Sequence, residues 1–493
     1  MTSCQDIMLL LLCAFLWMYV AGDICPYKEC DCSGNTISCE DKGLNEIPHL
    51  ISGSDSSFTT LLFSTNSIKA VPDGCLPSNL QSLSFVNNPI VTVNNVAFSR
   101  SSTTLKSLFF SNARFTRIPY ALHQLQSLTT LLLSNTKIED WDENVLKHIG
   151  QTITTLTIDN TNLITWPSWL QYFPLLTELS MDNNGISDIP DGAFNLVTNT
   201  LMSLSLDGNK LKAISPAVSI LTSLQTLSLT ENNISDTLNL PSGSQLMSLS
   251  LSGNKIYNDE QFSYALQSYS ESLRDISLDN NKFTKVPDLF FLEEVEHLDL
   301  SHNLISQPSS GSLPSGLYDI DFGYNLLPFI PKVLSTLNSA VELSLPWNNI
   351  RDIHGSDFPS SATTVDLTHN LITTLTSSSF PTVNSIQFLK LSSNPISAIS
   401  TDAFNSLHDL TELYLVSAKL ARVPLALVSL KNLKILNLTD NKSLVCTCLE
   451  ERLGPWTRGF SEDNLMGSCG VLSVYTFFTT LSPACPKSGG GVI

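Results

Sequence analysis

The sequence predicts an α/β solenoid, a coil of short repeated units in which each unit adds one strand to a shared parallel sheet. Three observations predict it: a nine-residue pattern recurs along most of the chain, its spacing is short and even, and cysteines gather near both ends of the patterned region. With 42% hydrophobic and 14% charged residues, the 493-residue chain has enough apolar material for a continuous core.

The chain begins with a short apolar segment. Residues 7–20 are apolar, too few to span a bilayer comfortably, and Val20, Ala21 and Gly22 supply the small residues of a cleavage site. We expect residues 1–22 to be a secretory signal peptide, although Asp6 stands where a lysine or arginine is usual. No later run reaches membrane-spanning length, and the Gly-rich tail at 487–493 has no apolar run. We therefore expect no membrane insertion by this chain.

Two even clusters of cysteine flank the patterned region, and Cys75 stands alone between them. The clustered cysteines are Cys25, Cys30, Cys32, Cys39, Cys446, Cys448, Cys469 and Cys485. In a secreted chain such clusters indicate disulfide-bonded caps. The alternative is two zinc sites, which the oxidising route and the lack of a histidine in either cluster disfavour. We expect an N-terminal cysteine cap at 23–57, a C-terminal cysteine cap at 445–486, and an unpaired thiol at Cys75.

Residues 58–444 carry the repeated pattern. Leu201-Met-Ser-Leu204-Ser-Leu206-Asp-Gly-Asn209 has apolar residues at its first, fourth and sixth positions and Asn at its ninth. This is the leucine-rich-repeat pattern LxxLxLxxN, and it occurs about seventeen times with spacings of 22 to 27 residues. The ninth positions are 66, 88, 113, 136, 161, 184, 209, 232, 254, 281, 303, 325, 348, 370, 394, 418 and 441.

The register assigns a direction to each side chain. Positions 3 to 7 predict a strand whose residues 4 and 6 point inward and whose residues 3, 5 and 7 point outward. We expect a curved horseshoe with the parallel sheet on the concave face and irregular or 3-10 segments on the convex face. The ninth-position Asn should satisfy buried turns, and less well where Ala113, Thr136 and Thr161 replace it.

The register also excludes one enzyme class. Asp321-Phe322-Gly323 matches the magnesium-binding signature of protein kinases, but Phe322 is an inward sixth position of a repeat. No glycine-rich ATP loop, Val-Ala-x-Lys strand or His-Arg-Asp loop accompanies it. No P-loop, HExxH or serine elbow occurs elsewhere, so we expect no enzyme and no cofactor.

The outward positions of repeats 10 to 14 are unusually acidic and aromatic. The candidate ligand-binding residues are Asp275, Asp279, Asp299, Tyr318, Asp319, Asp321, Tyr324, Glu342, Trp347 and Asp366, with His297, His302 and His369 among them. Such a surface suits a protein or peptide partner of basic character. The other interpretation is ordinary solvated surface, and a calcium site is a further alternative. A second acidic row, Asp159, Asp182 and Asp207, lies at position 7 of repeats 5 to 7.

The formal net charge of −19 argues against nucleic acid and anionic lipid as partners. Three Asn-x-Ser/Thr sequons occur. We expect glycosylation at Asn233 and Asn437, and little at Asn441, because Asn441 is a ninth position that should be buried. The sequence does not indicate the oligomeric state.

The array and its ends resemble extracellular leucine-rich-repeat proteins over nearly the whole chain after residue 22. Cys25-Pro26, Cys30-Asp-Cys32 and Cys39 are similar to the N-terminal cysteine cap of that family, and Cys446-Thr-Cys448, Cys469 and Cys485, with Trp456 between, to its C-terminal cap. The chain departs from the family in having Asn441-Lys-Ser where Asn-Pro is usual and Cys469-Gly470 where Cys-Pro is common. The pairs that the resemblance implies are Cys25–Cys32, Cys30–Cys39, Cys446–Cys469 and Cys448–Cys485.

The resemblance also implies a function. It indicates a secreted or cell-surface recognition protein that binds a protein or peptide ligand on the concave face. Two alternatives stay open: the ectodomain of a longer receptor, including a receptor kinase, and a structural extracellular-matrix protein.

Overall fold

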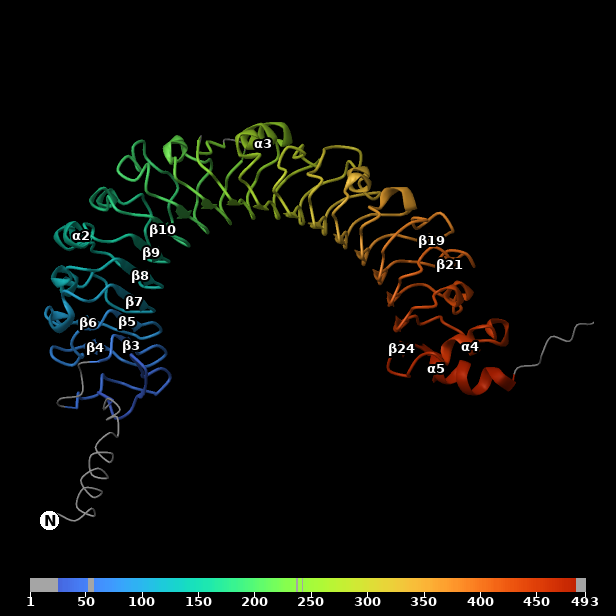
Figure 1. Ribbon diagram of the computed structural model, residues 1–493, viewed down its shortest axis with the longest axis horizontal. Helices are drawn as coiled ribbons and strands as arrows, with labels where there is room; N and C mark the ends of the chain where they lie inside the picture. The colour runs from blue at the N-terminus through green and yellow to red at the C-terminus, as the bar shows by residue number, and fades with distance from the viewer. Residues whose placement is uncertain (1–24, 52–56, 236–237, 242, 485–493) are drawn as a thin grey trace, which may run out of the picture. The chain divides into compact units, whose positions relative to one another are not determined.

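The computed structural model describes residues 25–51, 57–235, 238–241 and 243–484. The expected signal peptide, the Gly-rich tail and Cys485 lie outside these residues. The described chain forms two compact units that divide between Leu206 and Asp207. Each unit is a stack of repeats with its strands along one side and its short helices along the other (Figure 1).

The first unit is built on one sheet. Its first two strands form an antiparallel hairpin, and from β2 onward each strand pairs in parallel with the next. The strands are β1 (Asp31–Ser33), β2 (Thr36–Ser38), β3 (Thr60–Leu62), β5 (Ser82–Phe85), β7 (Ser107–Ser111), β8 (Thr130–Ser134), β9 (Thr155–Asp159), β10 (Glu178–Ser180) and β11 (Ser203–Ser205). A separate parallel pair joins β4 (Ala70–Val71) and β6 (Thr92–Val93).

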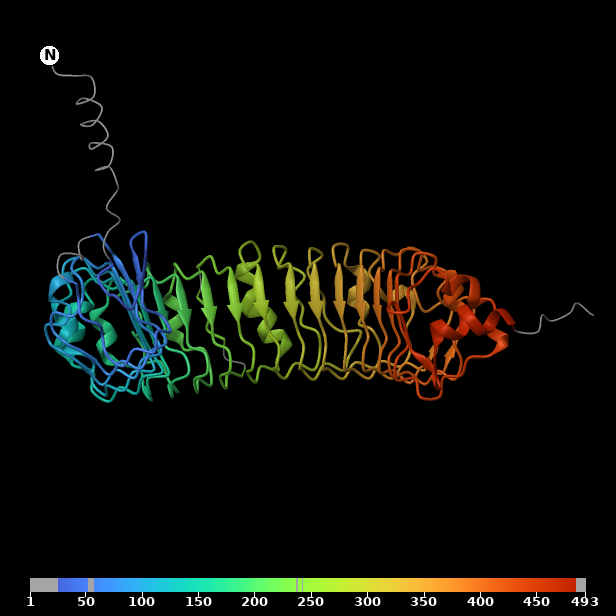
Figure 2. The ribbon, with the colours of Figure 1, turned by 90° about the horizontal axis from the view of Figure 1, so that it is seen from below.

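The second unit repeats this plan, and its strands lie side by side like rungs (Figure 2). All neighbours in its main sheet are parallel. The strands are β12 (Thr226–Ser228), β13 (Ser248–Ser250), β14 (Asp275–Ser277), β15 (His297–Asp299), β16 (Asp319–Asp321), β17 (Glu342–Ser344), β18 (Thr364–Asp366), β20 (Phe388–Lys390), β22 (Glu412–Tyr414), β23 (Ile435–Asn437) and β24 (Leu465–Met466). Two small pairs join β19 (Thr374–Leu375) to β21 (Ala398–Ile399) and β25 (Ser468–Cys469) to β26 (Leu472–Ser473).

The returning segments form short helices. The α-helices are α2 (Glu143–Ile149), α3 (Asp259–Leu266), α4 (Leu453–Thr457) and α5 (Val474–Thr476), and a π-turn spans Phe477–Leu481. The 3-10 turns are Ser99–Ser101, Tyr120–Gln124, Ser168–Tyr172, Pro216–Ile220, Gln267–Tyr269, Lys332–Thr336, Gly355–Asp357, Leu425–Ser429, Cys448–Glu450 and Ser482–Ala484. Helices α2 and α3 lie on the side of their units away from the strands (Figure 1).

Each of the seventeen predicted repeats contributes one strand that contains its positions 3 to 5. The inward positions are buried as predicted; in β16 and the residue after it, Ile320 and Phe322 have no exposed surface. In the first unit, the rings of Phe63, Phe85 and Phe110 stack through the core at 5.5 and 5.4 Å. The predicted leucine-rich-repeat solenoid with parallel strands and 3-10 segments is therefore confirmed.

The ninth-position asparagines form a buried hydrogen-bonded ladder. Asn325 shows the pattern: its amide oxygen accepts from the backbone N–H of Ile305 at 2.9 Å, and its amide nitrogen donates to the carbonyls of Leu300 at 2.9 Å and Phe322 at 3.1 Å. One side chain thus satisfies backbone groups of two consecutive repeats, which explains why Asn recurs at this position.

Three consecutive repeats that lack this Asn, at Ala113, Thr136 and Thr161, are built differently; Ala418 is a fourth such position. The hydroxyl of Thr136 accepts from the N–H of Ala113 at 3.2 Å and donates to the carbonyl of Ser134 at 2.8 Å, so fewer side-chain bonds are made. Strands β7, β8 and β9 are each five residues long, however, and pair over all five. Longer backbone pairing therefore offsets part of the loss. The preceding asparagines do not reach inward, because Asn112 donates to Asn87 and Asn160 to Asn135 on the exposed side.

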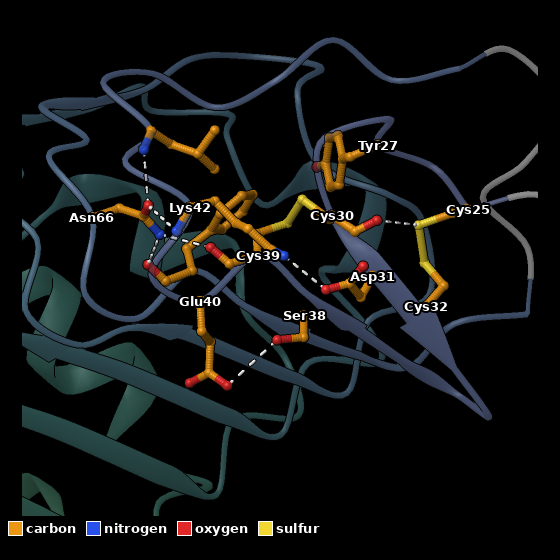
Figure 3. The surroundings of a disulfide bond; sticks show 12 residues. Cys25, Tyr27, Cys30, Asp31, Cys32, Ser38, Cys39, Glu40, Lys42 and Asn66 are labelled. Carbon is orange, nitrogen blue, oxygen red and sulfur yellow. Dashed lines mark hydrogen bonds and ion pairs between the residues drawn. A yellow bond between two sulfur atoms is a disulfide. The ribbon is translucent and has the colours of Figure 1, made fainter.

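The N-terminal cap covers the first end of the array. Cys25 is bonded to Cys32 and Cys30 to Cys39, the pairing that the resemblance implies (Figure 3). Asn66 of the first repeat ties the cap to the array, since its amide nitrogen donates to the carbonyl of Cys39 at 2.7 Å. Cys75 is a free cysteine.

The C-terminal cap contains the bond Cys446–Cys469. The fourth expected pair, Cys448–Cys485, includes a residue outside the described part of the chain. The indole N–H of Trp456 donates to the carbonyl of Leu430 at 3.0 Å, and the buried carboxylate of Glu450 pairs with Arg422 at 2.5 Å. These contacts hold the C-terminal cap against the last repeats.

Glycosylation should follow the burial of the sequons. The amide nitrogen of Asn441 is buried and donates to Leu415, Leu438 and Thr439, so it cannot enter a transferase site without local unfolding. We expect no glycan at Asn441, and modification at half-buried Asn233 and Asn437. Intact-glycopeptide analysis of the secreted protein checks this, and full occupancy of Asn441 would contradict it.

Candidate binding site on the second unit

Strands β14 to β20 bring the outward positions of repeats 10 to 15 into two rows. Position 3 supplies Asp275, His297, Asp319, Glu342, Thr364 and Phe388, and position 5 supplies Ser277, Asp299, Asp321, Ser344, Asp366 and Lys390. Since adjacent parallel strands are about 4.8 Å apart, carboxylates on neighbouring strands lie close enough to act on one ligand.

Part of these rows encloses a pocket of about 330 Å³, which we call the acidic pocket. Its acidic members are Asp299, Asp319, Asp321, Glu342 and Asp366, with His297, Ser344, Thr364 and Lys390 beside them. Lys390 is the one lysine or arginine of this lining, and it pairs with Asp366 at 3.3 Å. The ring nitrogen Nδ1 of His297 lies 3.8 Å from Asp319. The pocket thus carries an excess of negative charge.

The position-5 carboxylates are held by their own strands. The backbone N–H two residues on donates to each: Ser301 to Asp299 at 2.8 Å, Gly323 to Asp321 at 2.6 Å, and Thr368 to Asp366 at 2.9 Å. Because these bonds fix the side-chain directions, the pocket presents an ordered set of acceptors to a cationic group.

The surroundings of Asp321 raise the pKa of its carboxyl. Burial raises the pKa of its carboxyl above the ordinary value, the hydrogen bond from Gly323 lowers it in part, and the nearby charges of Asp299 and Asp319 raise it further. A half-buried carboxylate among like charges is a group that an incoming cation would stabilise.

The stability of the protein should report this perturbation. Because the pKa of Asp321 is higher in the folded protein than in the unfolded chain, its charge costs stability at neutral pH, and this cost disappears as the pH falls through the folded-state pKa toward 3.8. We expect Asp321→Asn to raise the thermal midpoint at neutral pH and to flatten this part of its pH dependence.

The matched control is Asp319→Asn, because the Asp319 side chain is 44% exposed and remains largely hydrated. Its thermal midpoint at neutral pH should change less. A lower midpoint for Asp321→Asn than for the parent would contradict the expected cost of burying this charge.

Not all candidate residues line the pocket. Asp275 and Asp279 lie outside it; the carboxylate of Asp279 accepts from the hydroxyl of Ser252 and from the amide of Asn280. Tyr318 is 47% exposed, with its ring centroid 6.3 Å from that of His297. The acidic row of the earlier repeats has a structural role, since the hydroxyls of Ser180, Ser205 and Ser228 each donate at 2.7 Å to Asp159, Asp182 and Asp207, respectively.

An aromatic row borders the acidic pocket at the end of the strands. It consists of His302, Tyr324, Trp347 and His369, the eighth positions of repeats 11 to 14. Successive ring centroids are 4.1, 5.5 and 3.7 Å apart, with interplanar angles of 11°, 11° and 14°. Tyr324 and Trp347 stay 46% and 47% exposed. The adjacency of all four follows from the repeat register, which puts each of them at position 8, whereas the stacking of their rings is known only from the structure.

The eighth position explains how the row forms. The φ angles of its four members are between 53° and 56°, in the left-handed region, and eight of the other thirteen repeats place Asn or Gly there, as at Asn280 and Gly253. The left-handed conformation of a non-glycine residue destabilises the fold by roughly 1–2 kcal/mol. Each stacked aromatic pair stabilises it by about 0.5–1.5 kcal/mol. The rings therefore hold one another in a conformation that the backbone disfavours.

Within the described ranges, no group of three or more His, Cys, Asp or Glu side chains could hold a metal ion. In the same part of the chain, no helix has the length and apolarity needed to cross a lipid bilayer. The site is an open, charged surface with aromatic edges.

The repeats, the parallel sheets and the disulfides near both ends define a leucine-rich-repeat protein with cysteine caps. A family model described as leucine rich repeat matches residues 174–234 and 360–420. Tsukushi of Mus musculus is 31% identical over 30% of this chain and 51% of its own length. Lumican of Homo sapiens is 27% identical over 33% of this chain and 42% of its own. The chain thus spans about half the length of these curated relatives.

Solved structures show the same fold at low identity. A leucine-rich-repeat protein of Leptospira interrogans is 23% identical with a TM-score of 0.60, covering 78% of this chain and 93% of that one. The structure of the Arabidopsis receptor kinase HAESA with the peptide hormone IDA and the co-receptor SERK1 matches at 19% identity and a TM-score of 0.55, covering 90% of this chain and 82% of that one.

Proposed function

We propose that this chain is a non-catalytic recognition protein, secreted or held at the cell surface, which binds a protein or peptide ligand of basic character on the sheet of its second unit. The observation that carries the proposal is the acidic pocket, with five carboxylates against a single lysine. Complementary charge of this kind steers a basic partner and selects against acidic ones.

The aromatic row supports the same proposal. Binding energy at protein interfaces concentrates in a few large side chains, Trp and Tyr above all, and charges around them set the association rate. Tyr324 and Trp347 provide such side chains beside the acidic pocket. Similarity to Tsukushi and lumican supports the extracellular setting of the proposal, and the proposed ligand chemistry rests on this chain's own residues.

Affinity capture tests the proposal. The protein is immobilised, exposed to conditioned medium at low and high salt, and the retained proteins are identified. The binding kinetics of each are then compared for the parent and for Asp319→Asn with Asp321→Asn. The matched control is Asp402→Asn with Asp409→Asn, which removes two exposed acids outside the pocket.

We expect saturable retention of a basic partner. The pocket variant should associate more slowly and with a weaker salt dependence, while the control should behave like the parent. Trp347→Ala should weaken binding by about 2 kcal/mol or more, as buried interface aromatics commonly do. A partner that binds pocket variant and parent with equal kinetics, or the absence of any saturable partner, would overturn the proposal and favour a structural role.

A further inference from the structure

A strip of exposed leucines lies next to the aromatic row in sequence and register. Leu304, Leu326 and Leu371 are the tenth positions of repeats 11, 12 and 14, two residues after His302, Tyr324 and His369, and they are 41%, 46% and 40% exposed. The residue between each pair is a buried ninth-position Asn. Row and strip together form an exposed, largely apolar band across four repeats, in which Asn349 of repeat 13 is the one polar tenth position.

The composition of the band departs from the rest of the array. Tenth positions elsewhere are mostly polar, and seven of them are basic: Arg114, Lys137, Lys210, Lys255, Lys282, Lys419 and Lys442. In repeats 11 to 14 neither the eighth nor the tenth position holds a lysine or arginine. Exposed apolar surface that is continuous and bordered by charge is characteristic of a contact surface.

The negative charge beside the band indicates which kind of partner would bind there. The band contains no carboxylate, lysine or arginine, and the adjoining acidic pocket is negative. A second copy of this chain would bring a net charge of −19 and the same acidic face, so the two copies would repel each other. The complementary partner carries apolar side chains in one row and basic side chains in a neighbouring row.

The arrangement of the apolar band and the acidic residues indicates the conformation of the partner segment. The band crosses three strand intervals, about 14 Å at 4.8 Å each, and the acidic side chains of the pocket lie at positions 3 and 5 of the same four repeats. In an extended segment, successive side chains point to opposite faces, so only one row would meet this surface. A helix of about ten residues spans 14 Å and presents an apolar stripe with basic residues along its flank.

We propose that the band formed by His302, Tyr324, Trp347, His369 and the three leucines is the docking surface for a basic amphipathic helix of a partner protein. The apolar stripe of the helix lies on the band, and its basic flank faces the acidic pocket. The proposal rests on the recognition function proposed above and specifies the element that is recognised.

A defined peptide tests this without a natural partner. The probe is a synthetic leucine–lysine peptide of about 14 residues with leucines at helical spacing. A second peptide has the same composition with leucine and lysine alternating, which favours an extended strand, and a third is oligolysine of equal charge. Binding to the intact secreted protein is measured by calorimetry, and circular dichroism follows the conformation of each bound peptide.

We expect the helical probe to bind tightest and to gain helicity when bound. Leu326→Ser and Trp347→Ala should each weaken its binding by about tenfold or more. The matched control is Leu196→Ser, since Leu196 is an exposed leucine of the first unit, and it should not change the affinity. Hydrogen exchange and thermal midpoints of the variants show that the fold is retained.

Two outcomes overturn the inference. If the alternating peptide binds as tightly as the helical one, the band does not select a helix. If Leu326→Ser and Trp347→Ala leave the affinity of the helical probe unchanged, the helix binds elsewhere. Neither outcome decides the proposed recognition function. That function is tested by whether the variant Asp319→Asn with Asp321→Asn associates more slowly with a basic partner in the capture experiment.

Discussion

Replacing Asn325 by alanine should destabilise the second unit by about 2–4 kcal/mol, because buried backbone groups lose their partners at roughly 1–3 kcal/mol each. The groups concerned are the N–H of Ile305 and the carbonyls of Leu300 and Phe322. Since each repeat contacts only its neighbours, hydrogen exchange should rise most in the repeats around β15, β16 and β17. Urea denaturation and amide exchange measure the two effects.

Asn349→Ala is the matched control. Asn349 is an exposed tenth-position residue in the following repeat, and its replacement should change stability by less than about 0.5 kcal/mol. Equal losses for the two variants would mean that water satisfies the turn groups of Asn325, and that the ladder contributes little beyond an ordinary surface amide.

Removal of the N-terminal cap bond Cys30–Cys39 should have an effect of similar size in the first unit. Cys30→Ala with Cys39→Ala should cost about 2–5 kcal/mol, because the bond closes the hairpin that covers the first repeat. Tyr27, Ile37 and Cys39 have no exposed surface in this cap, so its opening would expose apolar core. Thermal denaturation and mapping of proteolytic cleavage near the N-terminal end check the result.

Cys75→Ala provides the comparison. Cys75 is a half-buried free thiol whose sulfur donates to the carbonyl of Pro72 at 3.1 Å, and burial raises the pKa of this thiol to about 12. Its replacement should leave the cap intact and the cleavage pattern unchanged. If it destabilises the protein as much as the double variant does, the disulfide is not the main support of the cap.

The repeat register predicted most of the fold because it fixes two things at once: the alternation of side chains in each strand and the alignment of equal positions in neighbouring strands. Phe322 could be assigned to the core for the first reason, and Tyr324 could be placed beside Trp347 for the second. A single strongly periodic pattern was therefore enough to predict the strands, the core residues and which outward residues lie next to one another.

The site was less predictable, because it depends on what each side chain meets. Asp159 and Asp321 are both outward acids that face a serine of the neighbouring strand, and the pattern alone does not show that burial and the charges of Asp299 and Asp319 raise the pKa of Asp321. Likewise, His302 and His369 became part of the aromatic row only through the left-handed backbone and the stacked rings, which alternation in a regular strand does not describe.

The aromatic row also has an optical consequence. Trp347 lies with its ring 5.5 Å from Tyr324 and 3.7 Å from His369, and stacked chromophores at such distances are electronically coupled. Near-ultraviolet circular dichroism and indole emission should therefore contain a contribution from this row, and subtraction of the Trp347→Phe spectrum isolates it from the other tryptophans. The protein thus carries an intrinsic, label-free reporter at one edge of its second unit, which any molecule bound there would perturb.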